Sequence, residues 1–118
     1  MHELSLVRSI FATLKESLEP DEMEKVSQVS LKVGKLANVE PILLQNAYKA
    51  FLESNPEYER IKLDIQLVEI VVHCQTCGHK SQISHYKFIC SHCETPTNNI
   101  ISGEELLIHQ IHFDSVHA

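Results

Sequence analysis

The sequence is poor in glycine and in basic residues. Its three glycines are Gly34, Gly78 and Gly103, and their spacing allows neither a P-loop nor a G-x-G-x-x-G turn. Both kinds of nucleotide-binding loop are therefore excluded. Lysine and arginine together number 10 against 16 aspartates and glutamates, which gives a net charge of −6. Because a surface that follows nucleic-acid phosphates needs clustered basic residues, we expect no nucleic-acid partner.

Long apolar runs are also missing. No stretch of 18 apolar residues is present, so the sequence predicts no membrane-spanning helix. The opening MHELSLVRSIFATLK lacks the basic lead and the small-residue cleavage site of a signal peptide. We therefore expect a cytoplasmic protein with no membrane partner. In that compartment thiols stay reduced, and cysteines indicate metal ligands before they indicate disulfides.

Apolar periodicity predicts a mixture of helices and strands. Apolar residues at helical spacing from Leu4 to Leu18 predict a first helix. A second helix is expected to start at Pro41, capped by Asn38 or Glu40. We expect its inward face to carry Leu43, Ala47, Ala50 and Phe51. Alternation of apolar and polar residues predicts strands at 29–34, 61–67 and 107–113, the last two paired with each other.

The alternation changes phase after residue 67, just before the cysteines. Such a change indicates either a bulge or a strand that leaves one packing layer for another. The following window is polar and too short for a large core, so it needs a covalent or metal staple. We expect an α+β fold in which two helices pack on a small, antiparallel-rich sheet formed by residues 1–71 and 100–118. Residues 72–99 would form an inserted zinc-ribbon-like module.

The cysteines carry the strongest chemical signal. The spacing is C-x2-C, twelve residues, then C-x2-C, which gives Cys74, Cys77, Cys90 and Cys93. Each pair places two thiolates on one tight turn, and two such turns close a tetrahedral S₄ site that suits Zn(II). We interpret the site as structural, because four thiolates leave no position for water or substrate. Iron–sulfur ligation and a redox pair are the alternatives.

Three histidines flank or interrupt the cysteine pairs, at positions 73, 79 and 92. One interpretation is that they are exposed polar turn residues. The other is ligand exchange, in which an imidazole such as that of His79 replaces a thiolate as an accessory zinc ligand. The histidines at 85, 109, 112 and 117 are expected not to bind metal.

The N-terminus offers a second possible metal site. The Met1 amine, the amide nitrogen of residue 2 and the His2 imidazole can bind one ion in fused chelate rings. A fourth donor from the Glu3 backbone or carboxylate would complete the planar environment that Ni(II) and Cu(II) favour. The alternative is an ordinary helix start, with Glu3 placed favourably at the positive end of the helix dipole.

Taken together, these features resemble the HypA/HybF family of nickel-insertion accessory proteins for [NiFe]-hydrogenase maturation. The matching segments are MHELSLVRSI, VSLKVGKLANVEP, the C-x2-C-x12-C-x2-C module and GEELLIHQI. The resemblance implies a nickel metallochaperone without catalysis, which carries Ni(II) as cargo and holds Zn(II) structurally. Nickel would be bound by Met1, His2 and Glu3, with Glu40 as a further donor unless Glu40 only caps the helix at Pro41.

The resemblance also implies partners, namely a HypB-type nickel GTPase and the hydrogenase large subunit. One departure from the family concerns the residue after the second cysteine pair. Some relatives have histidine there, whereas this sequence has Glu94, which argues against a symmetrical exchange of cysteine for histidine. The alternative function is a zinc-ribbon module for protein interaction or regulation, without any role in nickel handling.

Overall fold

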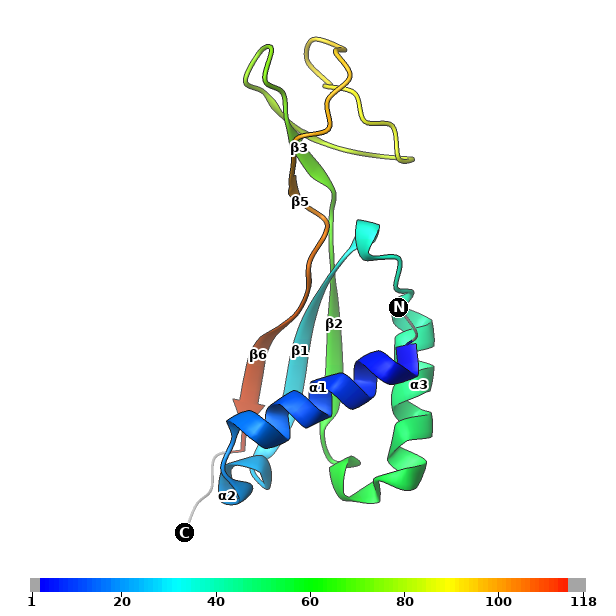
Figure 1. Ribbon diagram of the computed structural model, residues 1–118, viewed down its shortest axis with the longest axis vertical. Coiled ribbons are helices and arrows are strands. Elements are labelled where there is room, and N and C mark those ends of the chain that lie inside the picture. The colour runs from blue at the N-terminus through cyan, green and yellow to red at the C-terminus, as the bar shows by residue number, and fades with distance from the viewer. Residues whose placement is uncertain (1–2, 115–118) are drawn as a thin grey trace. The chain divides into compact units, whose positions relative to one another are not determined.

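The computed structural model describes residues 3–114. Its helices are α1 (Glu3–Ser17), α2 (Pro20–Met23) and α3 (Pro41–Ser54), with short 3₁₀ turns η1 (Lys35–Ala37) and η2 (Pro56–Tyr58). Its strands are β1 (Val26–Gly34), β2 (Lys62–Val68), β3 (Val71–His73), β4 (Lys80–Gln82), β5 (Ile100–Ser102) and β6 (Leu106–Phe113). Two three-stranded sheets form, in the orders β2-β1-β6 and β4-β3-β5 (Figure 1). The α+β fold class is therefore confirmed.

The chain divides into two compact units. Unit 1 comprises the described parts of residues 1–31, 39–66 and 107–118, and unit 2 comprises residues 32–38 and 67–106. Within residues 3–114, unit 1 contains the three α-helices, whereas unit 2 contains all four cysteines. None of the helices in residues 3–114 has the length and apolar character needed to cross a membrane.

The core of unit 1 is built on the predicted apolar stripe of α1, which is confirmed. Its buried residues are Leu6, Val7, Ile10, Phe11 and Leu14. Helix α1 crosses α3 (Figure 1), and the two helices are in contact. The Phe11 ring lies 5.5 Å from that of Tyr48, 5.0 Å from Phe51 and 4.9 Å from Tyr58, centroid to centroid. Such aromatic pairs stabilise a core beyond the area they bury.

The second predicted helix is present, but its inward face was partly wrong. Leu44, Tyr48 and Phe51 are its buried residues, while Leu43 is 49% exposed and Ala50 is also exposed. The apolar run at positions 42–44 is continuous, so periodicity alone does not fix the phase of the stripe. Tyr48 faces inward because its ring packs against Phe11. Its hydroxyl also finds carbonyl acceptors on that side of the helix.

The Tyr48 hydroxyl links α3 to the start of β2. It donates to the carbonyl oxygens of Ile61, at 2.6 Å, and Tyr58, at 3.0 Å. Burial raises the pKa of this hydroxyl to about 12. Tyr48→Phe should lower the free energy of unfolding at neutral pH by about 1 kcal/mol, the usual net value of a hydrogen bond.

The same hydroxyl predicts a specific pH dependence. Below about pH 10 it is protonated in both the folded and the unfolded chain, so its contribution is complete. Between pH 10 and the folded pKa of about 12, only the unfolded chain loses this proton readily, and stability falls. The difference in urea midpoint between wild type and Tyr48→Phe should therefore shrink above pH 10. If the difference in urea midpoint stays constant up to about pH 11.5, near the upper end of this window, the hydroxyl is not the source of the pH dependence.

The position of the last strand was predicted incorrectly. The sheet order is β2-β1-β6, so the strand at 106–113 lies beside β1 and not beside β2. The physical reason lies in β1, where Val29, Ser30, Leu31 and Val33 are all buried. A strand covered on both faces belongs in the centre of a sheet, and β2 and β6 take the two edges.

The phase change after residue 67 marks a change of sheet. Strand β2 ends at Val68 and β3 begins at Val71, and the two belong to different sheets. The second of the two alternatives is therefore confirmed. Strand β3 pairs antiparallel with both β4 and β5. A small core of its own supports unit 2, formed by Ile70, Val72 and Ile83 with Leu36, Phe88 and Ile100 against it.

Candidate metal centre

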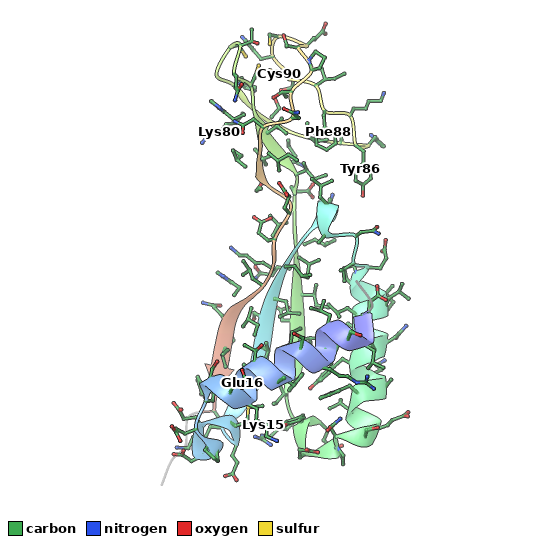
Figure 2. The ribbon with its side chains drawn as sticks, in the orientation of Figure 1. Lys15, Glu16, Lys80, Tyr86, Phe88 and Cys90 are labelled. Atoms are coloured by element: carbon green, nitrogen blue, oxygen red, sulfur yellow. The ribbon has the colours of Figure 1, made fainter. Side chains whose placement is uncertain are left out.

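The four cysteine sulfurs of unit 2 converge at one point. Cys74 Sγ lies 3.6 Å from Cys93 Sγ, and Cys77 Sγ lies 3.5 Å from Cys90 Sγ. All four sulfurs lie within 4.8 Å of one another. A tetrahedral ion with metal–sulfur bonds of about 2.3 Å holds its sulfurs about 3.8 Å apart. The cluster therefore fits a single four-coordinate ion, and Cys90 lies at the loops of unit 2 (Figure 2).

The first cysteine turn is held by two backbone hydrogen bonds. The Gly78 N–H donates to the Cys74 carbonyl oxygen at 2.8 Å, and the Cys74 N–H donates to the His79 carbonyl oxygen at 2.9 Å. Gly78 has φ +78°, a left-handed conformation that glycine adopts without strain. This conformation closes the turn around Cys77 and brings its sulfur back toward Cys74.

The second cysteine turn repeats this construction. The Glu94 N–H donates to the Cys90 carbonyl oxygen, and the Cys90 N–H donates to the Thr95 carbonyl oxygen, both at 2.9 Å. Glu94 has φ +63° and so occupies the left-handed position that glycine has in the first turn. A non-glycine residue is strained there, by about 1–2 kcal/mol. The second turn therefore keeps the same hydrogen bonds as the first, although its left-handed residue is not glycine.

Backbone amides stabilise the thiolate form of two cysteines. The N–H groups of Cys93 and His92 donate to Cys90 Sγ, at 3.5 and 3.4 Å, and they lower the pKa of Cys90 to about 6. The pKa of Cys74 is lowered in the same way, chiefly by the Cys77 N–H.

Cys77 shows the opposite shift. The His79 N–H lowers its pKa, but desolvation and hydrogen bonds with the neighbouring thiols outweigh that and raise the pKa to about 12. Four thiolates in so small a space repel one another, so a bound cation is what allows all of them to ionise.

A buried serine that sequence reasoning missed supports this cluster. Ser81 on β4 is 2% exposed. Its hydroxyl accepts the Ser91 N–H at 2.9 Å and donates to Cys90 Sγ at 3.8 Å. It also lies 3.1 Å from the Ser91 hydroxyl. No local pattern in Lys80–Gln82 marks this role, which exists only because β4 passes beneath the second cysteine turn.

Ser81→Ala should weaken metal retention by about 10–100-fold, the usual effect of removing an outer-shell partner. Removing the hydroxyl deprives Cys90 of one donor and deprives the Ser91 N–H of its acceptor. Competition with a chelating dye measures the change. Ser84→Ala, at an exposed position of the same unit, is the matched control. Equal retention by both variants would contradict this role.

The expected nickel ligands divide between described and undescribed residues. Met1 and His2 lie outside the described residues. Glu3 begins α1 and is partly exposed, and Glu40 is an exposed residue that precedes α3. Glu40 makes no side-chain capping hydrogen bond, so its carboxylate is not engaged in the capping role that was the alternative to metal binding.

The other described histidines are not members of the sulfur cluster. Among residues 3–114 the group of convergent metal-ligating atoms consists of the four cysteines alone. His79, the expected accessory ligand, is exposed beside the cluster, and His92 is exposed as well. His109 and His112 are exposed on β6, in unit 1.

Comparison with known proteins identifies the family of this chain. The family described as "Hydrogenase/urease nickel incorporation, metallochaperone, hypA" matches residues 1–113. The chain is 31% identical over 115 residues to the hydrogenase maturation factor HypA of Shewanella halifaxensis, covering 97% of this chain and 98% of that protein. It is 32% identical over 111 residues to HypA of Desulfitobacterium hafniense, covering 94% of this chain and 96% of that protein.

Solved structures agree on the fold. The solution structure of the Ni metallochaperone HypA from Helicobacter pylori has a TM-score of 0.62 at 23% identity and covers 96% of this chain and 97% of that one. A second solution structure, of a HypA protein, has a TM-score of 0.65 at 23% identity, with 96% of each chain covered. The chain belongs to the HypA family, whose members are metallochaperones of hydrogenase maturation and not enzymes.

Proposed function

We propose that this protein carries Ni(II) at its N-terminus and helps to insert it into the large subunit of a [NiFe]-hydrogenase. The ligands would be the Met1 amine and His2, with Glu3 and Glu40 as further donors. The observation that carries the proposal is the family match, which begins at residue 1 and so includes Met1-His2-Glu3. The similar Helicobacter pylori protein is itself described as a Ni metallochaperone.

Two features of unit 1 support the placement of nickel. Glu3 begins α1, and the N-terminal end of α1 crosses the first half of α3, the helix that Glu40 precedes (Figure 1). Glu40 is exposed and makes no capping hydrogen bond. A site on a chain terminus also has few protein ligands, which suits a carrier that must release its ion.

The cysteine cluster is proposed to hold structural Zn(II). Four sulfur donors at tetrahedral spacing suit zinc and leave no coordination position for water or substrate. Zinc would join the two cysteine turns of unit 2, whose own core contains few large side chains. Residues 72–99 are accordingly proposed as a zinc-binding module inserted between residues 1–71 and 100–118, which form the nickel-binding domain.

The proposed partners follow from the same function. A maturation factor interacts with the hydrogenase maturation machinery, and we propose a HypB-type nickel GTPase and the hydrogenase large subunit as its partners, in the cytoplasm. The sequence has neither glycine-rich nucleotide loop, so a separate protein is needed for any GTP hydrolysis that drives nickel transfer.

Nickel titration of the untagged protein tests the proposal. The wild type should bind one equivalent of Ni(II) at its N-terminus, and His2→Ala should weaken that binding by 100-fold or more, on the order of what loss of a central chelate donor produces. Acetylation of the terminal amine should have the same effect, whereas His109→Ala should have none. N-terminal binding that survives His2→Ala would favour the zinc-ribbon interaction module instead.

A further inference from the structure

Two histidines of unit 2 that the sulfur cluster does not use lie side by side. The imidazole rings of His79 and His92 have their centroids 5.4 Å apart and are inclined by 31° to one another. Both residues are exposed, so the pair is open to solution. They come from different cysteine turns and are thirteen positions apart in sequence (92 − 79 = 13). Only the fold of unit 2 brings them together.

The backbone of each histidine is fixed by the cysteine turn that carries it. The His79 carbonyl oxygen accepts the Cys74 N–H at 2.9 Å, and the His92 N–H donates to Cys90 Sγ at 3.4 Å. Residues 74 and 90 are both buried. The two imidazoles therefore project from rigid turns, and their approach requires only side-chain rotation. Such preorganisation lowers the entropy lost when two side chains bind one ligand.

We propose that His79 and His92 form a second metal site, a two-imidazole clamp for a divalent ion of the Ni(II), Cu(II) and Zn(II) class. Metal–nitrogen bonds of about 2.0–2.1 Å place the centroids of two imidazoles on one ion about 5 Å apart. The observed 5.4 Å is close to this value. Imidazole is the donor that these ions share, and water would fill the remaining positions.

This site is distinct from the cysteine cluster. The convergent group of sulfur ligands includes neither histidine, so the clamp can fill while all four thiolates keep their own ion. Electrostatics favour a cation at this position, because a divalent ion bound by the four neighbouring thiolates would carry a net charge of −2. The clamp would give unit 2 a place to capture an incoming ion. This inference does not rest on the proposed N-terminal nickel site.

The test is a titration of zinc-loaded, untagged His2→Ala protein with NiCl2, which removes the N-terminal site from the measurement. We expect one equivalent of nickel to bind without release of zinc. Additional His79→Gln or His92→Gln should each weaken that binding about tenfold or more, because either change leaves a single imidazole. His85→Asn is the matched control. It removes another exposed histidine of unit 2, at φ +55°, where asparagine is tolerated.

A second measurement keeps the result independent of variant folding. In nuclear magnetic resonance spectra of the histidine rings, Ni(II) should broaden the signals of His79 and His92 together and leave that of His85 sharp. The proposal is overturned if nickel uptake releases an equal amount of zinc, because the ion has then entered the thiolate site. It is also overturned if binding is unchanged in both glutamine variants, or if the His2→Ala protein binds no nickel.

Discussion

Replacing Cys90 with serine is expected to abolish tight zinc binding and to unfold most of unit 2. Cys90 is buried, and its Sγ accepts hydrogen bonds from the N–H groups of His92 and Cys93. Structural zinc sites contribute an apparent free energy of about 10–16 kcal/mol near neutral pH. The small core of unit 2 does not replace a contribution of that size, so loss of one ligand should release both cysteine turns.

The effect should be confined to one part of the chain. Helices α1 and α3 belong to unit 1, where Phe11 packs on Tyr48 and Phe51. Hydrogen exchange should therefore accelerate in β3, β4 and the cysteine turns while the amides of α1 and α3 remain protected. Removal of zinc from the wild type with a chelator should reproduce this pattern. Full protection of unit 2 in zinc-free protein would show that its own core is sufficient.

Gly34→Ala is expected to destabilise unit 2 by about 3 kcal/mol, the upper range for a side chain forced into a filled space. A Cβ atom at this position would lie 2.0 Å from the Gly103 carbonyl oxygen and 2.1 Å from its carbonyl carbon. Backbone atoms cannot rotate away as a side chain can. The Gly34 N–H also donates to the Glu105 carbonyl oxygen at 2.7 Å, so separating the two segments breaks that bond as well.

Gly78→Ala is the matched control, because alanine is disfavoured there by the backbone conformation and not by steric overlap. A Cβ atom there meets nothing within 4 Å, but φ is +78°. The loss should be only about 1 kcal/mol, the usual penalty of a left-handed alanine. Gly34 has an ordinary φ of −72°, so its loss is purely steric. Urea unfolding of the two zinc-loaded variants separates these causes, and equal losses would refute the close backbone approach at Gly34.

The sequence by itself determined the features that depend on local signals. The stripe of α1 follows from the spacing of its apolar residues, and the start of α3 from Pro41, which occupies its first turn. The cysteine spacing was sufficient to predict one four-sulfur cluster, because each C-x2-C turn is a local structure. The phase change after residue 67 likewise marked the passage from one sheet to another.

Only the tertiary structure decided which residues meet across distant segments. The order β2-β1-β6, the inward phase of α3 and the contact of Ser81 with Cys90 all depend on packing partners far away in the chain. The pairing of His79 with His92 is of the same kind. Periodicity reports which side chains avoid water, but it does not report what they touch. The convergence of the four cysteines could therefore be predicted from the sequence, whereas the contacts that support them could not.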